Sequence, residues 1–466
     1  MKRIRIHLCA LSALLAFGAC DKDTKSVEDI PVAEEKTQTF RLRVESIGED
    51  SKLDTRVSRP LFSISPRQTI DRVTFIILRN DASAEILMKR TITGWSDTDN
   101  IISQPYTERD TRGREANILL EGDELLPDGD YVVYAVGAHT GSFGGYEAFS
   151  DYEVGDAFLR AEMATVANDG IADEIFAGAE YLHVVDGKIW TRPNANANYE
   201  SATFTLRRQV AGMYGYFTRI PAKIGDEQVA KLRLVVSKRN RQVLFGGFRS
   251  MEDPENFNIE KVVNGVTPRT DYDSYLAGSA EKNGFATFEI SLKDWFPGAG
   301  DLPWDANGDG FLDENDENWQ VDTEVNEQGS VKLPKGSVYR GGFWVPIYIT
   351  EEEVAQGMPT FQLQLLGKDE QILKYWNVLK RQRQREEEET RSIVYLNERG
   401  QAVVRTEPDP SSPLTYNIAR NNLYTLGTKD MDQSYGEDKP IDLSVATDLV
   451  MDVNPEWTAI LSIIFE

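Results

Sequence analysis

The sequence contains one stretch in which oxygen-bearing side chains recur at alternate positions, the segment DANGDGFLDEND from Asp305 to Asp316. A loop with Asp or Asn at positions one, three, five and nine, glycine at six, a backbone carbonyl at seven and a Glu at twelve wraps a hard cation. The segment matches this template except at position twelve, where Asp316 has a shorter reach than Glu. It therefore predicts a structural Ca2+ site whose ligands are Asp305, Asn307, Asp309, Asp313, Asp316 and the carbonyl of Phe311.

The residues before this segment indicate what kind of calcium site it would be. The stretch WFPGAGDLPW contains proline and glycine and lacks a helical pattern, so the segment is not half of a paired helix-loop-helix sensor. A single loop of this kind on an exported protein binds calcium with modest affinity and braces the chain. Turns of Asp and Asn also arise by chance in an acidic protein, which leaves a loop without metal as the alternative.

Three tryptophans, Trp295, Trp304 and Trp319, lie close to the acidic segment in sequence. An exposed group of indole rings beside a calcium loop would form a platform for stacking sugars. Tryptophan in a β-rich protein lies more often in the core. Both roles stay open at the level of sequence.

Residues suited to catalysis are few. After the N-terminal leader described below, the histidines are His139 and His183, and neither lies in a zinc-protease or nucleophile-elbow motif. The sequence has no phosphate-binding or dinucleotide-binding glycine motif. Among 76 Asp and Glu residues some close pairs are inevitable, so no glycosidase-like carboxylate pair can be assigned. We expect a protein that is not an enzyme, with a hydrolase as the least favoured alternative.

Residues 1–19 have the layout of a secretory signal peptide. Basic residues precede an apolar stretch too short to span a bilayer, and Gly18 and Ala19 immediately precede Cys20. This order is similar to a bacterial lipoprotein signal, in which the cysteine receives a diacylglycerol and a peptidase cuts before it; Phe17 stands where leucine is usual. We expect lipidation at Cys20, with an ordinary signal peptide as the alternative. The other cysteine is Cys9, so the mature chain would contain no disulfide.

The composition excludes a nucleic-acid partner. The 466 residues carry a formal net charge of -25 and a pI near 4.7, whereas phosphate binding needs a basic surface. The hydrophobic fraction of 40% is enough to build cores, and the length allows two or three domains. These values fit an acidic protein outside the cell that contacts membrane only through the lipid of its precursor.

Most of the chain shows the two-residue alternation of β-strands. In TFRLRVE, Phe40, Leu42 and Val44 share one face, and the arginines between them share the other. Similar short segments are rich in β-branched and aromatic residues and are separated by Gly, Asn, Asp and Pro. Few segments keep a helical period, so the sequence predicts an all-β fold of sandwich type. Further predicted strands are 72–79, 85–92, 130–138, 202–208, 231–238, 343–350 and 361–367.

Polar stretches indicate the domain organisation. Residues 20–36 are charged and would form a tether between the lipid and the first domain. The segment RPNANANYES, residues 192–201, separates an earlier group of predicted strands from a later one. We therefore expect an N-terminal domain at 37–195 and a C-terminal domain at 196–466 that contains the acidic segment.

The last stretch of the sequence is strongly apolar. In residues 458–465, TAILSIIF, the odd-numbered positions are all apolar and two isoleucines lie on the other face. Burying each large apolar side chain is worth about 1.5–3 kcal/mol, so such a strand is stable only against protein. It can pair within its own domain or be donated to another molecule, and the sequence alone does not separate the two.

Two stretches give the sequence a family resemblance. Near the start, the lipoprotein signal and tether precede TFRLRVE, DTRVSRP and IDRVTFIILRND. Near the end, YNIARNNLYTLGTKD, residues 416–430, precedes LVMDVNPEWTAILSIIFE. This order of parts resembles the fimbrillins, or type V pilins, of Bacteroidetes-type bacteria. In that family an RN..Y.L strand precedes the final hairpin, and a Pro-x-Trp pair precedes the last strand.

The resemblance implies a fold and a way of assembling. It implies two β-sandwich domains in tandem, of the transthyretin-like, Greek-key kind, with few short helices. It also implies cleavage at the cell surface by an Arg-specific protease, which removes the lipid and the first strand, residues 38–46. Carried over to this sequence, the cut would follow Arg56, because Arg59 precedes Pro60; an ordinary exposed arginine is the alternative. A strand from a neighbouring subunit then fills the vacated groove, and residues 458–465 are the expected donor.

Together, the residues and the resemblance predict a structural subunit of cell-surface fimbriae that starts as an outer-membrane lipoprotein, polymerises by donor-strand exchange and contributes to adhesion. The expected partners are other fimbrial subunits, either copies of this chain or accessory subunits, and a ligand on a host or bacterial surface. The alternative is a monomeric outer-membrane lipoprotein that binds glycans through tryptophan and calcium.

Overall fold

The structure is a computed structural model of the chain. The described residues all belong to one unit of it, Thr37–Glu466. The predicted signal peptide, tether, Cys20, Arg56 and residues 458–465 lie outside the described residues. The structure describes residues 37–47, 70–97, 103–108, 111–158, 162–165, 172–190, 202–240, 242–245, 272–274, 285–323, 333–347, 361–380, 390–396, 402–408, 418, 420–428 and 438–454.

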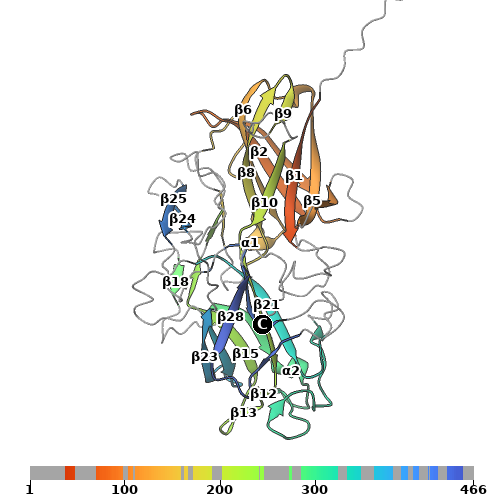
Figure 1. Ribbon diagram of the computed structural model, residues 1–466, viewed down its shortest axis with the longest axis vertical. Coiled ribbons are helices and arrows are strands. Elements are labelled where there is room, and N and C mark those ends of the chain that lie inside the picture. Colours follow the sequence, from red (N-terminus) through yellow and green to blue (C-terminus); the bar gives the residue numbers. More distant parts are fainter. Residues whose placement is uncertain are drawn as a thin grey trace, which may run out of the picture. The chain divides into compact units, whose positions relative to one another are not determined.

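The first sheet consists of nine strands: β1 (Thr37–Ile47), β2 (Arg72–Arg79), β3 (Ile86–Thr93), β4 (Ser103–Glu108), β5 (Thr111–Glu121), β6 (Gly129–Ala138), β8 (Phe176–Val185), β9 (Lys188–Trp190) and β10 (Thr203–Arg208). Their order is β3-β2-β6-β8-β10-β1-β5-β4, with β9 paired to β8. Neighbours run antiparallel except β1 and β10, which run parallel. Figure 1 shows β1 between β10 and β5.

The second sheet also consists of nine strands: β11 (Ala211–Thr218), β15 (Lys231–Val236), β19 (Ala286–Ser291), β21 (Val338–Trp344), β22 (Phe361–Leu366), β23 (Ile372–Lys380), β26 (Leu423–Leu426), β27 (Ile441–Asp442) and β28 (Leu449–Asn454). Their order is β19-β15-β22-β23-β28-β26-β11-β21, with β27 paired to β11. The parallel pairs are β23 with β28, and β11 with β26 and β27.

Short elements complete the described fold. The helical elements are η1 (Gly122–Glu124), α1 (Ser142–Gly145) and α2 (Leu292–Trp295). Within the described residues, no helix has the length and apolar character needed to cross a bilayer. The prediction of an all-β fold with few short helices is confirmed. Paired short strands are β12 (Ile220–Pro221) with β20 (Phe311–Leu312), β13 (Lys223–Ile224) with β14 (Glu227–Gln228), β16 (Lys238–Asn240) with β18 (Tyr272–Ser274), β17 (Gln242–Leu244) with β7 (Met163–Thr165), and β24 (Thr390–Leu396) with β25 (Ala402–Pro408).

Both large sheets curl, so that strands far apart in the sheet order approach each other. In the first sheet, Arg90 of β3 donates to the Leu119 carbonyl of β5 at 3.3 Å. In the second, β21 lies so close to β19 that a Cβ added at Gly342 would lie 2.3 Å from the Thr287 carbonyl oxygen. Curling of this kind buries one face of a sheet against itself, which explains how apolar strands form cores here.

The strand β2 is buried on both of its faces, which explains why its sequence is apolar without alternation. Val73, Phe75 and Ile77 belong to one buried cluster, whereas Ile76 and Leu78 belong to the other. Successive side chains of a strand point to opposite faces, so this strand is covered on both. A continuous apolar run is the pattern expected for such a strand.

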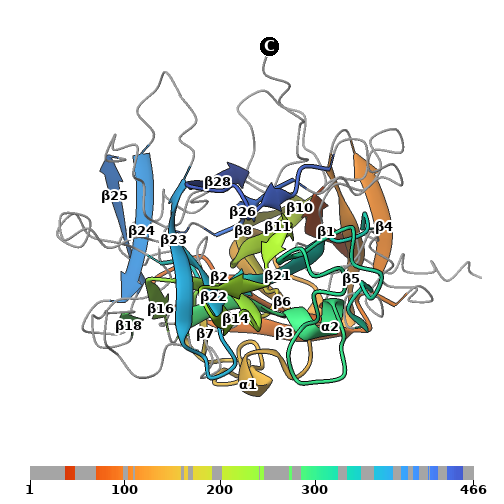
Figure 2. The same cartoon turned by 90° about the horizontal axis from the view of Figure 1, so that it is seen from below.

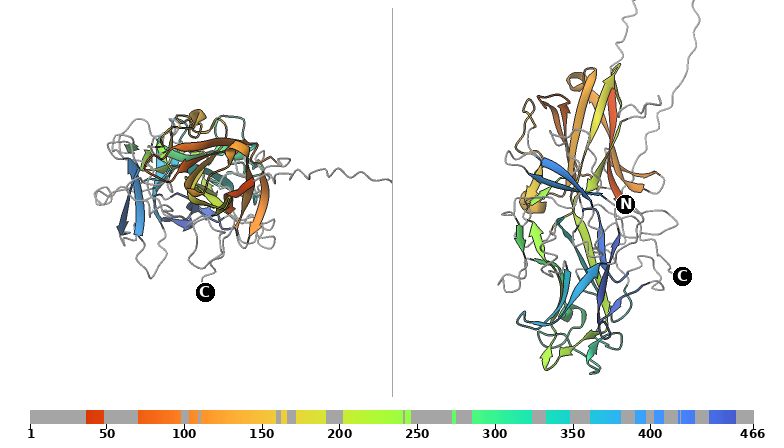
Figure 3. Two further views of the ribbon diagram at one scale, coloured as in Figure 1. Left: turned by 90° about the horizontal axis from the view of Figure 1, so that it is seen from above. Right: turned by 60° about the vertical axis from the view of Figure 1, so that its left-hand side comes forward.

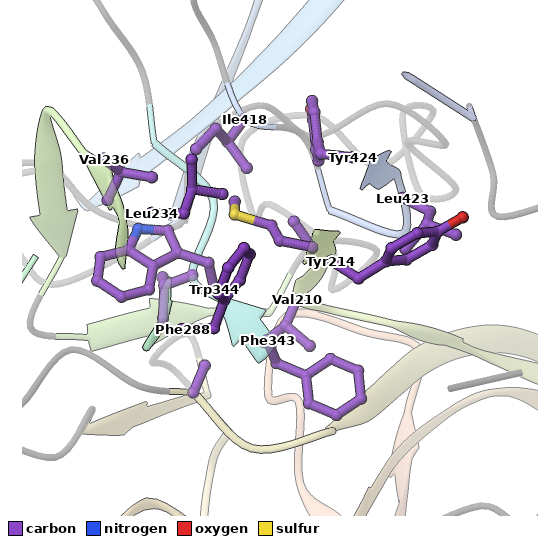
Figure 4. Packing of buried hydrophobic residues seen from close by; sticks show 14 of the residues in the cluster. Val210, Tyr214, Leu234, Val236, Phe288, Phe343, Trp344, Ile418, Leu423 and Tyr424 are labelled. Carbon is purple, nitrogen blue, oxygen red and sulfur yellow. The ribbon is translucent and has the colours of Figure 1, made fainter. Parts of the chain in front are cut away.

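The second sheet gathers its core from distant parts of the sequence. Figure 4 shows Tyr214 of β11, Leu234 of β15, Trp344 of β21 and Tyr424 of β26 in one cluster with Ile418. Each of these side chains is nearly or fully buried. The position of β26 therefore depends on strands that precede it by up to 200 residues or so, as long-range β-pairing requires.

Two predicted boundaries can be compared with the strands. β10 follows the predicted domain boundary at 195/196, yet it pairs with β8 and β1, so the change of sheet falls between Arg208 and Ala211. The predicted strand 343–350 differs from the structure, in which β21 runs from Val338 and ends at Trp344. Proline at 346 has no N–H to donate, which ends the ladder; Ile347 then forms an isolated bridge with Ile418.

Candidate functional site

The strand β1 occupies an interior position in the first sheet. All eleven of its residues face β5 in antiparallel register. On its other side, residues 41–44 pair in parallel with residues 203–206 of β10. We call the place that β1 fills between β5 and β10 the β1 slot; Figure 3 gives two further views of this strand, coloured red.

Alternate side chains of β1 lie in the core of the first sheet. Phe40, Leu42 and Val44 are 2%, 0% and 0% exposed, which confirms the predicted alternation. The ring of Phe40 contacts those of Phe75 and Phe204 edge-on, with centroids 5.6 Å and 5.2 Å away. Removal of β1 would therefore open three adjacent apolar pockets, the first of them lined by aromatic rings.

The fourth buried side chain on this face of β1 is polar. Gln38 is 4% exposed; its Nε2 donates to the Leu126 carbonyl at 2.7 Å, and its Oε1 accepts from the Leu126 N–H at 2.8 Å. Both polar atoms of the amide are thus matched by one backbone unit just after η1. Gln38 is not among the residues predicted from sequence, although a polar residue on the apolar face of an alternating strand is a visible signal.

The outer face of β1 carries a charge pair with β5. Arg43 lies opposite Glu115, and its Nε is 2.7 Å from the Glu115 Oε2. Arg41 approaches the same carboxylate, with 3.7 Å between its Nε and the Oε1. Glu115 itself is buried, at 7% exposed, while the arginines stay partly exposed. Cross-strand pairs of this kind help to fix the register of β1 against β5.

The acidic segment folds into a loop that its own side chains close. The carboxylate of Asp305 accepts the N–H of Gly308 at 2.7 Å and that of Gly310 at 2.8 Å. Asn307 and Asp309 each accept the N–H two residues later, at 2.8 Å and 2.9 Å. These are the turns that Asp and Asn form locally, so the predicted loop exists as a compact element.

The far end of the loop is buried. Asp313 and Asp316 are 1% and 0% exposed. Asp316 accepts the N–H of Ala306 at 2.7 Å and that of Asp313 at 2.9 Å, so its carboxylate ties the two ends of the loop together. Burial raises the pKa of the Asp313 carboxyl, and the nearby carboxylates act in the same direction. Arg219 lies beside this carboxylate, with 3.8 Å between its Nε and the Asp313 Oδ2.

Two other segments hold the loop in place. The N–H of Ala222, just after β12, donates to the Gly310 carbonyl at 2.9 Å. Because hydrogen bonds alternate along an antiparallel ladder, Phe311 then lies in the non-bonded pair opposite Pro221, and its carbonyl is not used by that ladder. A Cβ added at Gly336 would lie only 2.1 Å from the Glu314 nitrogen, so this glycine allows the backbone to approach.

The donor set of the loop suits a hard cation, but its carboxylates do not converge on one point. In the described part of the chain, no group of three His, Cys, Asp or Glu side chains is placed to hold a metal. Each carboxylate oxygen in the loop that accepts a backbone N–H keeps further acceptor capacity. Calcium binding by Asp305, Asn307, Asp309, Phe311, Asp313 and Asp316 thus stays a prediction.

The three tryptophans near the loop do not form a platform. Trp295 is fully buried in the large cluster, and Trp319 is partly buried with its Nε1 donating to the Ser337 carbonyl at 2.9 Å. Trp304 is 55% exposed. Two of the three rings serve packing, which removes most of the surface that a glycan site would need.

The RN pair of the C-terminal motif lies where the chain passes from one sheet to the other. Arg420 donates to the Gln209 side-chain oxygen at 2.7 Å, and the Asn421 N–H donates to the Val210 carbonyl at 2.9 Å. Arg208 is buried and pairs with Glu174 at 2.7 Å. The motif therefore fastens the strand β26 to the turn between β10 and β11.

Comparison with known proteins found similarities among solved structures; no family model and no curated protein matches the chain. The chain is similar to a protein described as a candidate cell adhesion protein from Bacteroides eggerthii, at 11% identity and a TM-score of 0.35, covering 90% of this chain and 95% of that one. It is also similar to a fimbrial assembly protein from Parabacteroides distasonis, at 10% identity and a TM-score of 0.29, covering 85% and 93%. A third is the fimbrial anchor protein Mfa2 from Porphyromonas gingivalis, at 11% identity and a TM-score of 0.22, covering 56% and 84%. These descriptions agree with the family that the sequence motifs resemble.

Proposed function

We propose that the protein is a structural subunit of cell-surface fimbriae, contributes to adhesion and joins its neighbours by donor-strand exchange. The observation that carries this proposal is the interior position of β1. Its connection to the rest of the first sheet runs through residues 48–71, which contain Arg56. A cut after Arg56 would leave β1 attached by non-covalent contacts alone, and therefore replaceable.

The consequence of losing β1 follows from what it covers. The facing edges of β5 and β10 would present N–H and C=O groups without partners, beside pockets that had held Phe40, Leu42 and Val44. Each of these side chains contributes about 1.5–3 kcal/mol when buried. An exposed sheet edge with an apolar groove binds an added strand, so the processed subunit would capture one.

The remaining parts of the proposal rest on sequence. Cys20 would carry the lipid of the outer-membrane precursor, and cleavage after Arg56 would release the subunit into the fimbrium at the cell surface. Residues 458–465 would be the strand that this subunit gives to a neighbour, because both of their faces are apolar. The acidic loop would bind Ca2+ as a structural brace, since its turns and buried carboxylates already form one end of a closed loop.

Controlled processing of the precursor tests the function. An Arg-specific protease added to the purified full-length chain is expected to remove the leading segment. Accessory subunits purified from the same source are then added, and the mixture is expected to give heat-resistant ladders on gels and fibres in electron micrographs. Arg56→Ala should abolish assembly. The bond between Arg59 and Pro60 is a poor substrate for the protease, so the control variant Arg59→Ala should assemble normally.

A truncation that ends before Thr458 separates two roles of the subunit, accepting a strand in the β1 slot and donating a strand to a neighbour. It should still release β1 on cleavage but fail to extend a chain of subunits. Normal fibres from both Arg56→Ala and the truncated protein would show that strand exchange is not how the protein assembles.

A further inference from the structure

The β1 slot makes a specific chemical demand on the strand that fills it. We infer that the slot selects a strand with a glutamine two residues before a large aromatic residue, and that it is therefore filled by a different subunit rather than by a second copy of this chain. This inference rests on the proposed strand exchange and names the partner of that same site.

The demand begins at Leu126. Leu126 is 6% exposed, and the Gln38 amide forms hydrogen bonds with both its N–H and its carbonyl. A replacement strand with an apolar side chain at this position would leave a buried donor and a buried acceptor without partners. Leaving such groups without partners costs more free energy than an ordinary hydrogen bond contributes. The amide therefore fixes the register of the strand and also adds to its affinity.

The three pockets that follow have a fixed order of size. The first holds Phe40 between two aromatic rings, the second holds Leu42 and the third holds Val44, all fully or almost fully buried. A smaller residue in the first pocket leaves a cavity, and a larger residue in the third overfills it. The slot therefore reads a sequence of glutamine, aromatic, leucine-like and valine-like residues at alternate positions.

The direction of this reading is set by the neighbouring strands. Along β5 the antiparallel register extends over the whole of β1, and β10 adds a parallel ladder over residues 41–44. A strand that keeps both ladders must run as β1 runs. Only a strand in that direction brings its first buried side chain to Leu126 and its second to the aromatic pocket.

The chain's own C-terminal segment does not meet this demand. In the direction of β1, its odd-numbered residues would place Ala459 at Leu126, Leu461 in the aromatic pocket and Phe465 in the smallest pocket. Its even-numbered residues would place Thr458 at Leu126 and Ser462 in the leucine pocket. The first choice leaves the amide partners unmatched and overfills the last pocket, and the second buries a hydroxyl among apolar side chains.

The opposite direction improves the fit only in part. There Phe465 would enter the aromatic pocket, with Ile463 and Leu461 in the other two. However, the strand would then run antiparallel to β10 and parallel to β5, so it would keep neither of the two ladders that β1 makes.

A competition experiment on the full chain tests the inference. A recognition sequence for a site-specific protease is placed within residues 48–69, and the folded protein is cut there with β1 still in place. Synthetic peptides then compete with a labelled peptide of β1, Thr37–Ile47. Fluorescence anisotropy reports their relative affinities.

Four quantitative results are expected from these peptides. A β1 peptide with Gln38→Ala should bind about 10- to 100-fold more weakly than the unchanged peptide, whereas Thr39→Ala, on the exposed face, should bind within about twofold. The peptide Asn454–Glu466 should be at least about tenfold weaker than the β1 peptide. Introducing Ala459→Gln, Leu461→Phe and Phe465→Val into it should recover about tenfold or more.

The outcomes distinguish the inference from the function on which it rests. If the unchanged C-terminal peptide binds as tightly as the β1 peptide, the slot accepts copies of this chain and the inference is wrong, while strand exchange stands. The inference is also wrong, with strand exchange again intact, if the Gln38→Ala peptide binds as well as the unchanged one. If the β1 peptide itself never enters the cut protein, strand exchange fails and the inference fails with it.

Discussion

The two strands nearest the ends of the described chain, β1 and β28, occupy similar positions in their sheets. Each lies in the interior, with one antiparallel and one parallel neighbour: β5 and β10 for β1, and β26 and β23 for β28. Figure 2 shows β28 close to β26. Each sheet therefore has, in its interior, a strand from one end of the described chain.

The two strands differ in how firmly they are held. Every residue of β1 faces β5, and its amide, aromatic and aliphatic side chains are buried in turn. In β28, by contrast, residues 449–451 pair with β23 and residues 452–454 pair with β26. Its Val450 is 38% exposed. The strand that is proposed to leave thus makes the more extensive contacts of the two, so its release would require both a cut and a replacement strand.

The largest expected effect is the loss of the aromatic side chain of β1. Phe40→Ala should lower the free energy of unfolding by about 3–5 kcal/mol, because it empties the pocket beside Phe75 and Phe204. Chemical denaturation of the uncut protein measures this value. Thr39→Ala on the exposed face is the matched control and should change it by less than about 0.5 kcal/mol.

The acidic loop gives the next effect, through a glycine outside it. Gly336→Ala should cost about 2–4 kcal/mol, because φ is +82° there and the new Cβ would lie 2.3 Å from the Asp313 carbonyl carbon. Gly308→Ala is the control, with φ +74° but nothing within 4 Å, and should cost about 1–2 kcal/mol. Equal losses would mean that the contact does not hold the loop.

A buried residue of β28 sharpens the comparison of the two strands. Met451→Ala should cost about 2–3 kcal/mol, less than Phe40→Ala, because a flexible side chain leaves a smaller and more readily collapsed space. The two variants are compared in the same denaturation series. A larger loss for Met451→Ala would reverse the proposed difference between β1 and β28.

Calcium is expected to act on the loop and to leave the slot unchanged. At ten times its Kd, bound Ca2+ should raise the free energy of unfolding by about 1.4 kcal/mol. Asp305→Ala should abolish both this gain and the heat of binding in calorimetry. The affinity of the cut protein for the β1 peptide should stay the same with calcium or chelator; a change would mean that the two regions are coupled.

The smallest effect concerns pH and a carboxyl group outside both regions. Burial raises the pKa of Glu162, and the Asp151 charge adds to this, while the Tyr146 hydroxyl at 2.5 Å and the Phe149 N–H at 2.9 Å oppose it. The folded protein then binds more protons than the unfolded chain just above pH 4.5. Stability from this group is therefore fully present below that pH and is lost as pH rises through the folded pKa.

Denaturation between pH 4 and 7 measures this contribution as a difference between the native protein and Glu162→Gln. The variant should lose that part of the slope, because its amide does not titrate. An unchanged slope would assign the pH dependence to other carboxyl groups. Substitutions in β1 or β28 should leave this pH dependence unchanged.

Much of the local structure could be predicted from sequence. The alternation in β1 and the apolar run in β2 identify these strands, and the spacing of Asp and Asn indicates the turns of the acidic loop. The end of β21 at Trp344 was missed, although the proline two residues later is a local signal. The membership of β10 in the first sheet could not be predicted, because it depends on pairing with β1 across about 160 residues.

The candidate site, too, could be predicted only in part from the sequence. The apolar residues of β1 were predicted, whereas Gln38 was not, since its partner Leu126 lies 88 residues away in a loop. Trp295 and Trp304 both lie shortly before the acidic segment, yet one is buried and the other exposed. Only the packing of the second sheet distinguishes them.

The sequence by itself determined the strands with clear alternation or continuous apolar runs, such as β1 and β2, and the turns of the acidic loop, because alternation and side-chain-to-backbone hydrogen bonds act over a few residues. Only the tertiary structure decided that β1 lies between β5 and β10 and that its glutamine meets Leu126. Those pairings join residues far apart in the chain, and their free energy exists only when all the neighbouring strands are in place.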